Sequence, residues 1–133
     1  MPIFSSAVKV NSQYMHMVRF NVEVKGDLKS SDIISRLEND QFVTLTHHSS
    51  TNRIFSFGRD HGFYGRIYNQ AVVSLPSLSV SSNGNITRVV GYAMTPQDGN
   101  SLLSSIAATM YGLKGNDYLN HIAPIQKYLI NEV

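Results

Sequence analysis

Few side chains in this sequence of 133 residues have the types and spacing needed for catalysis. There is no cysteine, which excludes a thiolate nucleophile, a disulfide or a cysteine-ligated zinc from these residues. His16 lies in a segment of alternating residues, and histidine suits acid–base chemistry because it ordinarily titrates near neutral pH. A histidine packed on an apolar face with its ring nitrogens hydrogen-bonded is the structural alternative.

The adjacent pair His47–His48 is the second histidine feature. Neighbouring residues of an extended segment point to opposite sides, and no carboxylate cluster lies near the pair in the sequence. We therefore expect a solvated loop pair and no metal site.

Positive charge is concentrated in one window of the chain. Four arginines and one acid, Asp60, lie between Arg53 and Arg88, whereas charges elsewhere nearly cancel and the formal total is +2. Arg53, Arg59 and Arg66 are of the type that binds phosphate through paired hydrogen bonds, and exposed arginines in structural ion pairs are the alternative. Four arginines are too few to predict nucleic-acid binding from charge alone.

The strand that must position His16 is predicted by strict alternation over residues 11–24. One side of it is mainly apolar and carries Tyr14, His16, Val18, Phe20, Val22 and Val24. The other side carries Met15, Met17, Arg19, Asn21 and Glu23. Because methionine adapts to irregular surfaces, this second side favours a subunit contact or a second packed layer.

The remaining elements follow from turn and capping signals. Asn83–Gly84 predicts a hairpin, and the glycines between residues 54 and 64 predict a loop with at most one helical turn. Further strands are predicted over residues 42–46, 67–74 and 86–94. Helices are predicted after an N-cap at Ser30, from Thr95–Pro96 to a C-cap at Gly112, and over residues 123–130.

This order of elements predicts a single α+β domain over residues 1–133. Its sheet is expected to be mixed and mostly antiparallel, with helices packed on one face. No run of residues approaches the length of a membrane span, and no secretory signal pattern opens the chain, so we expect a cytoplasmic protein without membrane contact.

Four segments together resemble the archaeal-type glyceraldehyde-3-phosphate dehydrogenases, in their C-terminal half only. They are His-Met-Val-Arg-Phe-Asn-Val-Glu-Val at residues 16–24, Arg59-Asp60-His61-Gly62, Ile67-Tyr68 and Thr95-Pro96-Gln97-Asp98. No single segment is specific, but the set is collinear from about residue 11 onward.

The resemblance implies the substrate-binding and oligomer-forming half of a glycolytic, NAD(P)-dependent oxidoreductase. It implies a catalytic role for His16, binding of the substrate phosphate by Arg59, and a homo-oligomer. Tyr14 stands where the family has the first histidine of its pair, and the nucleophilic cysteine is missing. A Gly-x-Gly-x-x-Gly fingerprint is also missing, so no cofactor is expected on this chain alone. NAD or NADP would belong to the complete enzyme, in which either a separate nucleotide-binding chain or a missing N-terminal half supplies the other part.

Two alternatives stay open beside this one. The first is a catalytically silent, stand-alone relative that uses the sheet for self-association or small-ligand binding. The second is a small RNA-binding α+β module, because residues 61–68 loosely resemble the aromatic strand of RNA-recognition domains. The glycines in that segment disfavour a strand, and with it a nucleic-acid partner.

Overall fold

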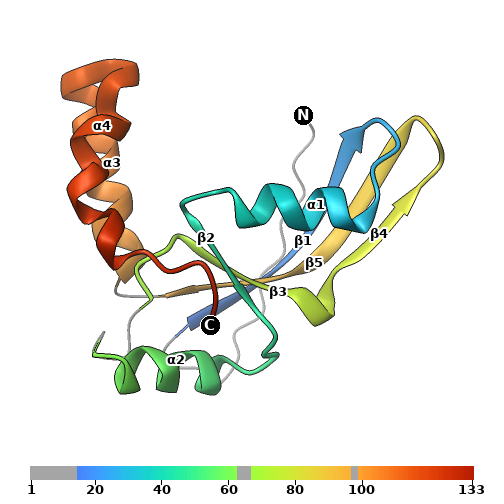
Figure 1. Cartoon of the computed structure of the whole chain (residues 1–133), viewed down its shortest axis with the longest axis horizontal. Coiled ribbons are helices and arrows are strands. Elements are labelled where there is room, and N and C mark those ends of the chain that lie inside the picture. The colour runs from blue at the N-terminus through green and yellow to red at the C-terminus, as the bar shows by residue number, and fades with distance from the viewer. Residues whose placement is uncertain (1–14, 63–66, 97–98) are drawn as a thin grey trace.

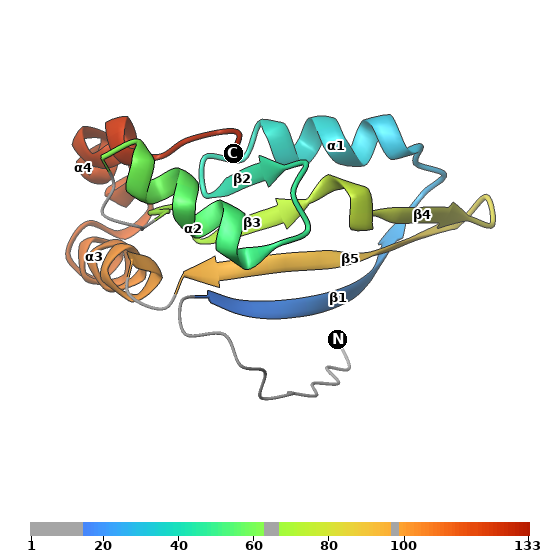
Figure 2. The same ribbon diagram turned by 90° about the horizontal axis from the view of Figure 1, so that it is seen from below.

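The computed structural model describes residues 15–62, 67–96 and 99–133. Within this part of the chain, five strands form one sheet in the order β1-β5-β3-β2, and β4 pairs with another stretch of β5. Figure 2 shows β2, β3, β5 and β1 side by side, with α2 in front of them. The strands are β1 (Met15–Lys25), β2 (Val43–Thr46), β3 (Ala71–Ser74), β4 (Ser79–Ser82) and β5 (Ile86–Pro96).

Helices lie between these strands along the chain and follow the last of them. The α-helices are α1 (Ser30–Glu38), α2 (Thr51–Asp60), α3 (Gly99–Lys114) and α4 (Tyr118–Ile122). The 3₁₀ helices are η1 (Leu75–Ser77), η2 (Gly115–Asp117) and η3 (Ala123–Tyr128). Only β2 and β3 are parallel, whereas β1, β3 and β4 all run antiparallel to β5. The predicted α+β class with a mixed, mostly antiparallel sheet is confirmed.

The core is divided between the two faces of the sheet, because Val72 and Val73 are neighbours on β3 and point to opposite sides. Val72 packs with Met15, Met94 and Ile54 of α2. Val73 belongs to a second cluster, which includes Leu45, Ala93 and, from α1, Ile34 and Leu37. Helices α1 and α2 therefore cover opposite faces (Figure 1), and the expectation that the helices share one face is wrong.

Helix α2 is the largest departure from the predicted elements, because residues 54–64 were expected to be a loop. Ile54, Phe57 and Gly58 recur at helical spacing and lie on the side packed against the sheet. Gly58 is buried inside this helix, so the glycine that suggested a loop instead permits close packing. The described part of the window after α2, residues 61 and 62, is a turn in which Gly62 has a φ of 80°.

Helix boundaries differ from the predictions by one to a few residues. Helix α1 begins at Ser30 with Lys29 as its N-cap, and the Asp32 carboxylate accepts the Lys29 N–H at 2.8 Å. Thr95 and Pro96 end β5 and do not open a helix, and Gln97–Asp98 lie outside the described residues.

The two C-terminal helical predictions also shift. Helix α3 runs through Gly112 to Lys114 and stops where Gly115 adopts a left-handed φ of 59°. The last predicted helix is α4 followed by the 3₁₀ helix η3.

The strand predicted over residues 11–24 is confirmed from Met15 onward, whereas residues 11–14 lie outside the described residues. Its burial does not follow its sequence pattern. Met15, on the side predicted to be polar, is 3% exposed under α2. Val18 and Val22, on the apolar side, are 46% and 44% exposed. Burial therefore depends on which positions of β1 the rest of the chain covers: Phe20 packs against the cluster around Val73, whereas Val18 and Val22 on the same side do not.

The C-terminal segment closes the free edge of β2. The Leu45 N–H donates to the Asn131 carbonyl at 2.7 Å, and the Val133 N–H donates to the Leu45 carbonyl at 2.9 Å. Fully buried Asn69 accepts the Ile130 N–H through Oδ1 at 2.9 Å. This arrangement holds η3 beside α3 at one end of the sheet (Figure 1).

Candidate functional site

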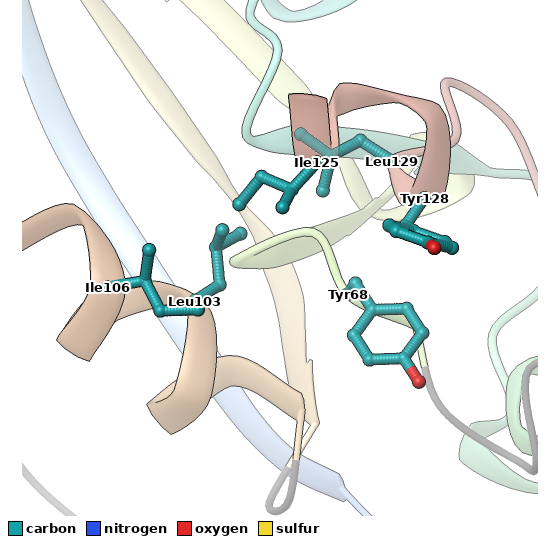
Figure 3. Close-up of a pocket in the computed structure, with 6 residues that line it drawn as sticks. All are labelled: Tyr68, Leu103, Ile106, Ile125, Tyr128 and Leu129. Carbon is teal, nitrogen blue, oxygen red and sulfur yellow. The ribbon is translucent and has the colours of Figure 1, made fainter. Parts of the chain in front are cut away.

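An apolar pocket lies where the C-terminal segment, α3 and the approach to β3 meet. Its volume is about 210 Å³. Figure 3 shows Leu103 and Ile106 of α3 on one side and the η3 segment on the other, with Tyr68 below. Its lining is Tyr68, Leu103, Ile106, Ile125, Tyr128 and Leu129.

The two tyrosines of the lining lie near each other, and a lysine lies beside one of them. The rings of Tyr68 and Tyr128 lie 6.2 Å apart at a tilt of 56°, and the Lys127 ammonium lies 5.0 Å from the Tyr128 ring centroid. The lining side chains that the structure describes are apolar apart from the two phenol hydroxyls, a composition typical of a binding pocket.

A second, open groove lies beside α2, and most of the residues that line it are polar or charged. It is lined by His48, Asn52, Arg53, Ser56, Phe57, Asp60 and His61. The His61 ring stacks on Phe57 at 4.0 Å and donates from Nδ1 to the Phe57 carbonyl at 2.9 Å. These two contacts hold His61 at the end of the helix, next in sequence to the Arg59–Asp60 ion pair.

Arg59 lies in the last turn of α2 and is exposed. Its Nε donates to Asp60 Oδ1 at 2.8 Å. The hydrogen bond to Arg59 lowers the pKa of Asp60, and the same contact raises the pKa of Arg59. The predicted phosphate ligand therefore already has a carboxylate partner, whose negative charge would oppose the binding of a phosphate.

His16 lies on β1, opposite Thr95 of β5, and its side chain is exposed. The neighbouring Met15 packs under α2, so by strand alternation His16 points to the other face of the sheet. The structure therefore does not bring His16 and Arg59 together. A catalytic site that uses His16 or Arg59 would therefore need residues from other segments.

Neither histidine of the His47–His48 pair lies in a ligand cluster. His47 Nε2 is 3.8 Å from Glu132 Oε1, and both side chains are well exposed. The His48 carbonyl accepts the Ser74 hydroxyl at 3.1 Å. Among the residues that the structure describes, no group of three histidines or acids could hold a metal ion. In the same residues, no helix has the length and apolar character required to cross a bilayer.

One unit of the fold has the connectivity of a dinucleotide-binding motif, so its residues can be compared with what such a motif requires. Strand β2, helix α2 and strand β3 form a βαβ unit, the unit whose first turn binds the pyrophosphate in dinucleotide-binding domains. That turn requires glycines for close approach of the backbone, and here it reads His47-His48-Ser49-Ser50. These residues do not fit the cofactor.

The segment that resembled an RNA-binding strand does not form one where it is described. His61 and Gly62 form a turn, and Ile67 and Tyr68 precede β3 without entering it. Tyr68 instead lines the apolar pocket. The pocket itself was not predicted, although its parts were: the apolar stripes of α3 and of the tail carry five of its six residues.

The comparisons with known proteins agree with the family resemblance over part of the chain. No protein-family model matches this sequence, and no solved structure matches it. The chain is 35% identical over 85 residues to the glyceraldehyde-3-phosphate dehydrogenase of Methanocaldococcus jannaschii. The aligned residues make up 61% of this chain and 25% of that protein. The chain is thus a distant relative of a glyceraldehyde-3-phosphate dehydrogenase and spans about a quarter of its length.

Proposed function

We propose that this chain is the substrate-binding and oligomer-forming half of a glyceraldehyde-3-phosphate dehydrogenase-like oxidoreductase that uses NAD or NADP. The observation that carries the proposal is the 35% identity over 85 residues to the Methanocaldococcus jannaschii enzyme. It is supported by the collinear order of the segments that resemble the family and by the α+β fold of the described residues.

In this proposal a nucleotide-binding unit outside these residues holds the cofactor and provides the nucleophilic cysteine. The chain has no cysteine, and its βαβ turn does not fit a pyrophosphate. His16 is proposed as the proton-transferring or hydrogen-bonding group, since its exposed side chain on β1 is open to a second unit. Arg59 is proposed as the phosphate ligand, acting from the opposite face after exchanging Asp60 for the substrate.

The test is a chimera in which this chain replaces the corresponding region of the Methanocaldococcus jannaschii enzyme. We expect reduction of NAD or NADP that depends on glyceraldehyde 3-phosphate. His16→Ala should lower kcat by about 10² to 10⁴, the usual contribution of a general acid–base group. His121→Ala is the matched control, because His121 lies on α4 and pairs with Asp117 at 3.1 Å. Equal activity of both variants would remove His16 from the mechanism.

A catalytically silent relative is the second candidate, and one observation favours it. His16 and Arg59 lie on opposite faces of the sheet, so these residues alone do not assemble a catalytic centre. A well-folded chimera without activity, together with a stable homo-oligomer of the chain, would favour this candidate.

A further inference from the structure

Strand β1 presents an edge that no other described strand covers. It is eleven residues long and, in the described part of the sheet, is bonded only to β5. A long edge strand is a template for pairing with another chain, because its outward N–H and C=O groups lack strand partners.

The residues that face outward follow from the ladder. The Gly26 N–H donates to the Asn85 carbonyl at 2.7 Å, one step beyond the Lys25–Ile86 pair. Because hydrogen-bonded pairs alternate in an antiparallel ladder, even-numbered residues of β1 bond to β5 and odd-numbered residues face away. The Tyr92 N–H is consistent with this alternation. Tyr92 lies opposite Arg19, an odd-numbered residue, and its N–H donates away from β1 to Ser77 Oγ.

The outward backbone groups are therefore those of Met17, Arg19, Asn21, Glu23 and Lys25. We propose that this edge pairs with β1 of a second copy of the chain, antiparallel and in the register that places Asn21 opposite itself. In this register Arg19 of each copy lies opposite Glu23 of the other, so two opposite-charge pairs form across the two-fold axis. No ion pair joins Arg19 to any other described residue, whereas Glu23 is held by Arg88 at 2.7 Å.

The other side of the strand is also complementary in this register. Phe20 lies opposite Val22 of the second copy, and Val18 lies opposite Val24. These are non-hydrogen-bonded positions, where side chains approach most closely, and pairs of aromatic and β-branched residues favour such contacts. The pairing would cover Val18 and Val22, which are 46% and 44% exposed in the single chain.

Neighbouring registers lack this complementarity. Centring the two-fold on Val22 places Arg19 opposite Lys25, and centring it on Arg19 places that residue opposite itself; both juxtapose like charges. Centring on Phe20 leaves Arg19 opposite Asn21 and Glu23 opposite Met17. Among these registers, only the one centred on Asn21 matches both arginines with both glutamates. This inference does not rest on the proposed enzymatic function, since it uses only the edge of the sheet.

Reversing the charges of Arg19 and Glu23 tests whether the partner of β1 is a second copy of the chain. Sedimentation of the full chain should give a dimer of twice 14.8 kDa. Arg19→Glu alone and Glu23→Lys alone should each weaken association about tenfold or more, because each introduces two like-charge contacts. An equal mixture of the two variants should recover the dimer as a heterodimer. Arg36→Glu, the same charge change on the exposed side of α1, is the control. A monomer at all concentrations, or single variants that associate like the parent, overturns the proposal.

A single cysteine tests the register, since the chain has none of its own. The two Asn21 Cα atoms would lie about 5.5 Å apart in the proposed pairing, within the range a disulfide needs. Asn21→Cys should therefore form a disulfide-linked dimer rapidly under mild oxidation. Met17→Cys is the matched control, because its two copies would be roughly 27 Å apart. Cross-linking of Met17→Cys as fast as Asn21→Cys overturns this register.

Discussion

At the scale of single residues, Gly91 shows how closely the sheet is packed. It lies on β5 opposite Phe20 of β1. A Cβ atom at this position would lie 2.7 Å from Phe20 Cζ and 2.9 Å from Leu78 Cδ2. Phe20 and Leu78 both pack against the cluster around Leu45 and Val73, so moving either side chain away would disturb that packing.

Gly91→Ala should therefore lower the free energy of unfolding by about 1–3 kcal/mol, the usual cost of overpacking. Gly112→Ala is the matched control, because Gly112 lies on exposed α3 with open space around its Cα. That change should stabilise the protein by up to about 1 kcal/mol through helix propensity. Urea unfolding measures both, and a neutral Gly91→Ala would show that Phe20 and Leu78 are loosely held.

The Arg59–Asp60 ion pair should determine how the Asp60 carboxyl titrates. The hydrogen bond from Arg59 lowers the pKa of Asp60, so Arg59→Gln should move that pKa back up toward the ordinary value of an aspartate. Since the folded-state pKa is depressed, the pair contributes to stability above the ordinary aspartate pKa. That contribution is lost as the pH falls through the lowered value. Carboxyl NMR titration measures the shift. Arg53→Gln, on the same helix, should leave it unchanged, and an equal effect of both substitutions would contradict the assignment to Arg59.

At the scale of elements, the sequence predicted strands better than helices. Alternation located β1, and the Asn83–Gly84 signal located the hairpin, in which Gly84 adopts a φ of 91°. Helix α2 was missed because glycines outweighed the spacing of Ile54, Phe57 and Gly58, and only the tertiary position of the helix shows that Gly58 is a packing residue. The exposure of Val18 and Val22 has the same origin, since alternation does not show how far the covering helices extend.

The candidate site was predictable in its parts but not in its assembly. The apolar stripes of α3 and the tail were visible in the sequence, but the pocket exists because Asn69 and β2 bring the tail back to the sheet. Those contacts join residues 61 and 86 positions apart, a separation that local patterns do not report. For the same reason, the sequence did not show that His16 and Arg59 lie on opposite faces.

Asn69 should control the docking of the tail. Asn69→Ala removes the acceptor of the Ile130 N–H inside a fully buried site, which should cost about 1–3 kcal/mol of unfolding free energy. It should also speed amide hydrogen exchange at Ile130. Asn52→Ala, on the exposed side of α2, should stay within about 0.5 kcal/mol. Unchanged exchange at Ile130 would mean that the tail is held chiefly by Thr44 and Leu45.

At the scale of the whole molecule, the described residues form an α+β sheet with a free edge at β1 and a covered edge at β2. His16 lies on β1 and Arg59 on α2, on opposite faces of the sheet, so the described residues assemble no complete centre from the two. This agrees with the proposal that the chain, which spans about a quarter of the length of its dehydrogenase relative, acts together with a nucleotide-binding unit.

The most direct measurement is the rate of NAD(P)H formation from glyceraldehyde 3-phosphate, taken for the purified chain and for the chimera described above. The account predicts no turnover by the chain alone and substrate-dependent turnover by the chimera. Turnover by the single chain, or an inert chimera that folds and assembles normally, would contradict it.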